Sequence, residues 1–182
     1  MNRKTLWITQ TALLLALLVS VQMITSSMKN TLITGSLVNL ILIIAVMLGG
    51  LSSGLTVACL SPIFAFFFGI GPAFWQIIIC IALGNAVLVV AWHFIAGRNS
   101  KMSVASTITA TIVGGVAKFI FLYLSVVQFL LPFVLHLQGP QAKMISATFS
   151  VPQLITALIG GGIAVVVLPL LTKALGSKMR LN

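Results

Sequence analysis

Lys118 is the residue in this sequence most able to do chemistry, because it lies inside the apolar run GGVAKFIFLY. The sequence has no Asp and no Glu, so no carboxylate side chain can neutralise this ammonium. At ~1.5 Å rise per residue, Lys118 lies about 20 Å from either end of its predicted helix. An ionisable group at that depth is by default a functional one. We therefore expect Lys118 to bind an anionic group of a ligand. The alternative is donation to backbone carbonyls, or an uncharged amine.

Other polar side chains fall at mid-depth or nearer one surface of the predicted helices. Because they come from different helices, one polar pocket that opens outward would gather them. Asn39 and Asn85 have an alternative role, since membrane asparagines often bond neighbouring helices. Trp75 has one too, because an aromatic at a helix end is often an interface anchor. The predicted binding residues are Lys118, Asn85, Asn39, Gln153, Thr156, Gln22 and Trp75.

The sequence lacks the residues that several classes of protein function need. No G-x-x-x-x-G-K-[ST] loop occurs, and no acidic residue exists to hold Mg²⁺ or to relay protons. His93 and His136 lie on segments predicted to open on opposite sides, so we expect no shared metal. Cys59 and Cys80 are interpreted as free thiols. We expect no catalytic residue, no metal and no cofactor. Apart from Lys118, the ten basic residues cluster at segment ends, which argues against a nucleic-acid partner.

The composition predicts an all-α integral membrane protein with six transmembrane helices in a single domain, residues 1–182. The chain is 60% hydrophobic and 5% charged, whereas soluble domains carry roughly 25% charged residues. Apolar runs near 20 residues match the length that crosses a bilayer. The connection 132–150 is long enough to act as a lid. The predicted spans are about Leu6–Thr25, Leu32–Leu48, Leu55–Phe68, Trp75–Ala96, Val104–Leu131 and Val151–Leu175.

The distribution of basic residues predicts the orientation of these spans. With six spans, both termini share one side. Positive charge favours the cytoplasmic side, so both termini are predicted to be cytoplasmic. The shared side would hold Arg3, Lys4, Arg98, Lys101, Lys173, Lys178 and Arg180, and the other side Lys29 and Lys143.

A stripe of small residues follows the first predicted helix. Ala12, Ala16 and Ser20 are four residues apart, so they share one helix face. Small side chains allow close approach of another helix, either from a partner protein or from this chain. We predict that this stripe docks a partner.

Together these features resemble a substrate-binding S component of an energy-coupling factor type ABC vitamin transporter. The resemblance covers the whole chain and includes ITGSLVNLILIIAVMLGG, ALGNAVLVV, VPQLITALIGGG and the Ala12-x-x-x-Ala16 pair. It implies a subunit of the bacterial cell membrane that captures a vitamin from outside. It also implies delivery inward by a module of one transmembrane coupling protein and two ATPases, with the small-residue stripe as the docking face for the coupling protein.

The sequence leaves alternatives both for the vitamin that is bound and for the class of membrane protein. The resemblance is nearest to cobalamin-specific members, and the phosphodiester of cobalamin would suit Lys118. Pantothenate is the other candidate, because its carboxylate suits a lone buried Lys as well. Outside this family, the chain would be a stand-alone secondary carrier or channel, or a structural membrane protein.

Overall fold

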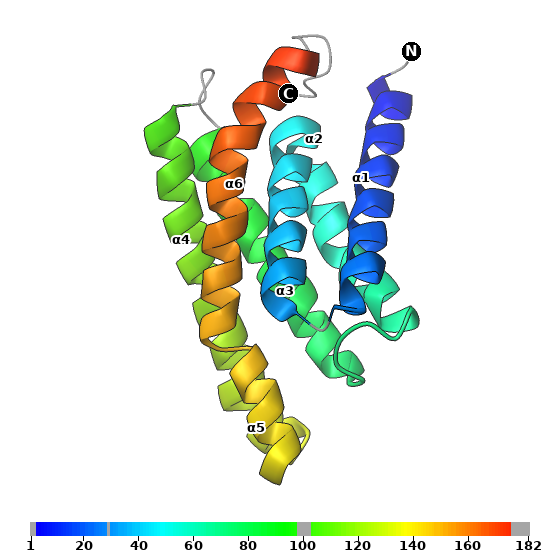
Figure 1. Ribbon diagram of the computed structural model, residues 1–182, viewed down its shortest axis with the longest axis vertical. Helices are drawn as coiled ribbons and strands as arrows, with labels where there is room; N and C mark the ends of the chain where they lie inside the picture. The colour runs from blue at the N-terminus through cyan, green and yellow to red at the C-terminus, as the bar shows by residue number, and fades with distance from the viewer. Residues whose placement is uncertain (1–2, 29, 98–102, 176–182) are drawn as a thin grey trace.

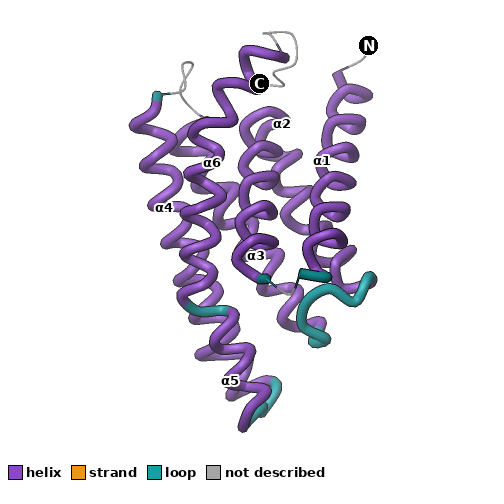
Figure 2. Tube along the Cα trace, in the orientation of Figure 1, coloured by secondary structure: helices purple, strands orange, loops and turns teal. Residues whose placement is uncertain are grey.

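The computed structural model describes residues 3–28, 30–97 and 103–175, and within these ranges the chain is helical without any strand. Loops are confined to the ends of the helices (Figure 2). Two segments, labelled η, are wider π-helical continuations of the helices that precede them. The elements are α1 (Arg3–Ser26), α2 (Thr31–Phe67), α3 (Trp75–Trp92), η1 (His93–Gly97), α4 (Val104–Leu122), η2 (Tyr123–Val134), α5 (Gly139–Thr148) and α6 (Val151–Leu175).

Five helices of the described part are long and apolar enough to cross a membrane. Their outward side chains are apolar as well: Leu13 is 68% exposed, Ile24 70% and Val166 65%. Exposed apolar surface on this scale is unfavourable in water but matches lipid tails. The fold is thus that of a multi-pass membrane protein. The five segments are Lys4–Ser26, Thr31–Phe67, Trp75–Gly97, Val104–Val134 and Gly139–Ala174.

The second and third predicted spans both lie in α2, which consists of two helices that meet at one non-helical residue, Gly50, with φ 78° and ψ 178°. The break falls within the predicted GGLSSG connection, but it takes one residue rather than the whole stretch. Only glycine adopts this backbone region readily. The Cβ position of Gly54 lies 2.8 Å from Val46 Cβ, so the chain folds back on itself at Gly50. The two halves of α2 run in opposite directions (Figure 1).

The predicted long loop 132–150 is largely wrong, because most of it is helical. η2 continues through Pro132 to Val134, and α5 occupies Gly139–Thr148. The wide turns of a π-helix, with bonds such as Leu135 N–H to Leu130 O at 2.9 Å, let the helix continue past the proline. α5 packs on η2 and α6 instead of forming a free lid.

α1 begins and α6 ends at the same end of the molecule, where η1 also ends and α4 begins (Figure 1). Lys4 in the first turns of α1 and Lys173 in the last turn of α6 therefore share this end, as predicted. Lys143 lies on α5, at the opposite end. Of the other basic residues in the orientation argument, Lys29, Arg98, Lys101, Lys178 and Arg180 lie outside the described residues.

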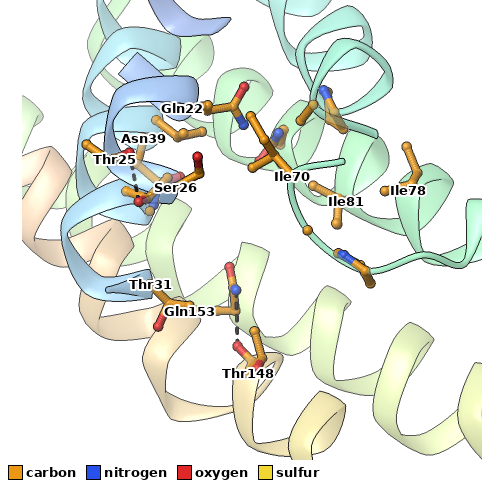
Figure 3. Close-up of a pocket in the computed structure, with 18 of the residues that line it drawn as sticks. Gln22, Thr25, Ser26, Thr31, Asn39, Ile70, Ile78, Ile81, Thr148 and Gln153 are labelled. Carbon is orange, nitrogen blue, oxygen red and sulfur yellow. Dashed lines mark hydrogen bonds between the residues drawn. The ribbon is translucent and has the colours of Figure 1, made fainter. Parts of the chain in front are cut away.

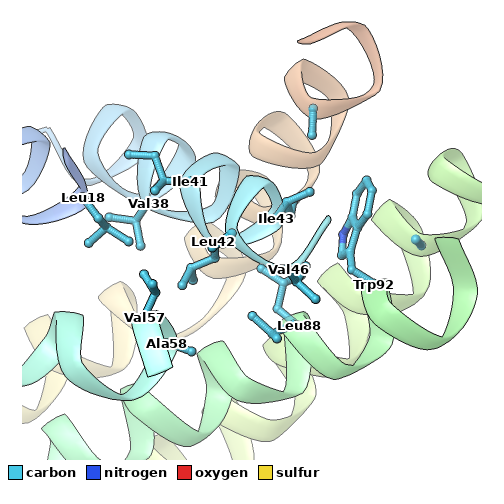
Figure 4. Packing of buried hydrophobic residues seen from close by; sticks show 14 of the residues in the cluster. Leu18, Val38, Ile41, Leu42, Ile43, Val46, Val57, Ala58, Leu88 and Trp92 are labelled. Atoms are coloured by element: carbon cyan, nitrogen blue, oxygen red, sulfur yellow. The ribbon is translucent and has the colours of Figure 1, made fainter. Parts of the chain in front are cut away.

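The half of the bundle near the chain ends is filled by apolar side chains. Leu42, Leu88 and Trp92 are fully buried there and pack with Val57 and Ala58 of the second half of α2 (Figure 4). Glycines bring the helices together around this cluster. Gly114 faces Leu88, Ala91 and Trp92, and Gly115 faces Ala157, so these two glycines serve helix packing.

Candidate ligand-binding site

The ammonium of Lys118 is held by two asparagine side chains. Its Nζ donates to Asn39 Oδ1 at 2.6 Å and to Asn85 Oδ1 at 2.7 Å. Asn39 Nδ2 in turn donates to Thr156 Oγ1 at 3.3 Å. Lys118 is 3% exposed, and its partners are buried to a similar extent. Neutral amide oxygens therefore take the place that a carboxylate would occupy in most proteins, and no counter-ion from this chain offsets the charge.

Four elements meet at this network because glycines permit close approach. Asn39 comes from α2, Asn85 from α3, Lys118 from α4 and Thr156 from α6. A Cβ on Gly35 would lie 2.8 Å from Thr156 Cγ2, and one on Gly160 would lie 2.8 Å from Asn39 Cβ. Larger residues at these positions would push α2 and α6 apart and separate Asn39 from Thr156.

A cavity of about 370 Å³ extends from this network toward the end of the bundle opposite the chain termini. In Figure 3, Thr25, Ser26 and Thr31 lie on one side of it, and Ile70, Ile78 and Ile81 lie on the other. The turn between α2 and α3 supplies part of the wall. The lining residues include Gln22, Thr25, Ser26, Asn30, Thr34, Val38, Asn39, Pro62, Ile70, Pro72, Ile78, Ile81, Asn85, Lys118, Phe149 and Gln153.

The structure brings most of the predicted binding residues together. Lys118, Asn39, Asn85, Gln153 and Gln22 all line this cavity. The two asparagines line the cavity and also bond Lys118 across helices, so the same side chains take both predicted places; that they bind a ligand stays a prediction.

Thr156 does not line the cavity but supports it from behind, through its bond to Asn39. Trp75 does not line the cavity: it is the first residue of α3 and is 61% exposed. This exposure matches the alternative role as an interface anchor.

The small-residue stripe faces outward. Ala12, Ala16 and Ser20 are exposed, whereas Thr11 and Leu18 on the other face of α1 are buried. Packing inside this chain, the alternative role for the stripe, is therefore excluded for these three residues.

Sequence reasoning missed the part of the wall that comes from turns. Ile70 and Pro72 from the turn after α2 and Phe149 after α5 contribute apolar surface. The turn sequence GIGPAF carried a weak signal, because glycine and proline marked a turn but not the direction of its side chains.

The described residues contain no group of three or more His, Cys, Asp or Glu side chains that could hold a metal ion. Cys59 is exposed and Cys80 half-buried, and both are free thiols. The polar groups of the site are ammonium, amide and hydroxyl groups, which bind by hydrogen bonding and charge.

Comparisons with protein-family models, with curated proteins and with solved structures found no match to this chain. The resemblance to S components stays a prediction. The cavity and its polar groups carry the functional argument.

Proposed function

We propose that this protein is a substrate-binding membrane subunit that captures a small anionic vitamin in the cavity above Lys118. One observation supports this proposal most. The ammonium of Lys118 is buried at the deep end of a cavity, and its hydrogen-bond partners among the described residues are neutral amide oxygens. The sequence contains no acidic residue that could neutralise it. Two of the three N–H groups of Lys118 bond to asparagines, which leaves the third for a ligand. An anion there would supply the negative charge that the sequence lacks.

The size of the cavity bears on the choice of vitamin. Drug-sized ligands occupy pockets of roughly 300–1,000 Å³, so about 370 Å³ suits a small acid. Pantothenate, a short chain with one carboxylate, fits this range. Cobalamin, with its corrin ring and nucleotide tail, requires a much larger opening of the bundle. The cavity volume therefore favours pantothenate or a similar small acid over cobalamin.

The other half of the molecule supports capture rather than independent transport. Beyond Asn39, the described helices are packed by apolar residues such as Leu42, Leu88 and Trp92. A carrier that worked alone would need a polar route or a relay there. We propose instead that an ATP-driven module, made of a coupling protein and two ATPases, moves the loaded subunit. In this proposal the protein resides in the bacterial cell membrane with both termini in the cytoplasm, and the two halves of α2 bring the crossings to six.

The direct test is isothermal titration of the full chain in nanodiscs with pantothenate and, in parallel, cobalamin. One-to-one binding of pantothenate with little heat from cobalamin supports the proposal in full. Binding of cobalamin alone retains the capture role but refutes the small-acid ligand. Transport of pantothenate by the isolated chain in liposomes under an ion gradient would refute the role as a subunit.

The exposed stripe on α1 gives the test for the partner. Ala12→Trp adds a large side chain to an outward face, so it should block docking of a coupling protein without reaching the cavity. We expect transport by the assembled complex to fall at least tenfold while binding by the isolated chain is unchanged. Val166→Trp, at an exposed position on α6, is the matched control. Equal loss of transport in both variants would show that the stripe is not a specific docking face, and normal transport by Ala12→Trp would place docking elsewhere.

A further inference from the structure

The polar groups at the deep end of the cavity differ from those on its wall in the hydrogen bonds that they can still make. At the deep end, the amide oxygens of Asn39 and Asn85 are already occupied by Lys118. Besides one lone pair on each amide oxygen, these three residues still offer N–H groups: the third proton of Lys118, the amide of Asn85 and one proton of Asn39. The deep end thus donates hydrogen bonds and suits a group that only accepts them, such as a carboxylate.

The wall formed by α1 and the start of α2 has the opposite character. Thr34 Oγ1 donates to Thr25 Oγ1 at 2.8 Å, and Thr25 Oγ1 donates to Val21 O at 2.7 Å. Ser26 Oγ donates to Met23 O at 2.8 Å. A hydroxyl has one proton, so these residues have only lone pairs left for a ligand.

Two glutamines add side-chain amide groups to the cavity. Gln22 lines the cavity, and its Oε1 is buried without a hydrogen-bond partner among the described residues. Gln153 Nε2 donates to Thr148 O at 3.1 Å, which leaves its oxygen and its second N–H for a ligand. These amides therefore keep hydrogen-bonding capacity that a polar group of a ligand can use.

The wall opposite the hydroxyls is apolar. Ile70, Ile78 and Ile81 line it, as Figure 3 shows. A ligand that spans the cavity would therefore need an aliphatic part that lies along this wall.

We propose that the cavity selects an elongated monoanion with a carboxylate at one end and a hydroxyl or amide group at the other, where the side-chain amide of Gln22 hydrogen-bonds to it. This inference rests on the proposed function and adds the second half of the recognition. Lys118 alone would accept any small acid. Gln22 distinguishes hydroxylated or amide-bearing acids from plain fatty acids of the same length.

The test is isothermal titration of the full chain with three probes. Pantothenate has both features, pantothenol replaces the carboxylate by an alcohol, and hexanoate keeps the carboxylate without any donor at the far end. We expect the wild-type chain to bind pantothenate at least tenfold more tightly than either of the others. Gln22→Met should weaken pantothenate binding about tenfold, the effect of one buried hydrogen bond, and leave hexanoate unchanged.

Gln10→Met is the matched control, because Gln10 lies on the same helix and also has a buried oxygen without a partner, but does not line the cavity. Its affinity for all probes should equal that of the wild type. Unchanged pantothenate binding in Gln22→Met would overturn the inference while the proposed function stands. An equal loss of pantothenate and hexanoate would also overturn it, since Gln22 would then only shape the cavity. If the wild type bound none of the three, both proposals would fail.

Discussion

The two halves of this bundle are built from the same apolar helices but differ in how their interior is filled. Toward the chain termini, the side chains of Leu42, Leu88 and Trp92 are fully buried and fill the space between the helices. Toward the other end, the same helices leave a cavity of about 370 Å³ lined by Lys118, Gln22 and neighbouring polar groups.

The difference shows how a small membrane protein can combine rigidity with binding. In the packed half, Thr11 Oγ1 donates to Ser53 Oγ at 2.9 Å between helices, and Trp92 Nε1 is buried without a partner among the described residues and does not line the cavity. In the cavity half, Lys118 and its two asparagines lie beside open space, so a ligand can reach their remaining N–H groups. Substitutions in the first region should change stability, and substitutions in the second should change binding.

The largest effect should come from Lys118→Met, which keeps the length of the side chain and removes its charge. We expect affinity for pantothenate to fall at least 100-fold, or about 3 kcal/mol, because the charged partner of the carboxylate is lost. The variant should still elute as a monodisperse peak, since replacing a buried charge with an apolar group is often neutral for folding. Isothermal titration and size-exclusion chromatography measure the two effects.

Two further variants make this test specific to the buried charge. Asn85→Asp keeps Lys118 but gives it a carboxylate from this chain at the position now 2.7 Å away, so binding of an anion should also drop sharply. Lys143→Ala removes an exposed lysine of α5 outside the cavity and should bind normally. Normal binding by Asn85→Asp would show that the ligand does not supply the charge of Lys118.

The helical spans and most polar residues of the site could be predicted from the sequence because each depends on local composition. A run of about 20 apolar residues marks a span whatever its neighbours are. Lys118, Asn39 and Asn85 stand out because polar groups are rare at that depth. Trp75, which lies outside the cavity lining, could not be told apart in this way, since an aromatic at a helix end has the same local sequence whether it faces lipid or a cavity.

The arrangement of the helices could not be predicted from the sequence, and the reason is physical. In a soluble helix, a polar face contrasts with the apolar face that packs inward. Here both lipid and core are apolar, so Leu13, which is exposed, and Leu18, which is buried, look alike. The pairing of Lys118 with both asparagines depends on helix rotation, which small contacts such as Gly35 against Thr156 determine.

In the packed half, Leu42→Ala should reduce stability rather than binding. Lipid is as apolar as the core, so the loss comes mainly from packing contacts and the cavity left behind, about 2 kcal/mol or more. A lower melting temperature in detergent, with pantothenate affinity within about twofold of the wild type at a temperature where both are folded, is the expected result. A large change in affinity at constant stability would contradict the division between the two halves.

The smallest effect that still separates the two regions should come from the glycines of α6. Gly160 lies at the contact with α2, where an added Cβ would be 2.6 Å from Ser36 O and 2.8 Å from Asn39 Cβ. Gly160→Ala should therefore push α2 away, at a cost of about 1–3 kcal/mol in stability, and should weaken binding several-fold because Asn39 moves relative to Lys118.

Gly162→Ala is the matched control two residues further along the same helix, where an added Cβ meets nothing within 4 Å. Alanine favours a helix over glycine, so this variant should be neutral or slightly stabilising. If both variants bound pantothenate equally well, the position of Asn39 would not matter for the ligand. The charge of Lys118 alone would then account for binding, and the close contact between α2 and α6 would serve only the fold.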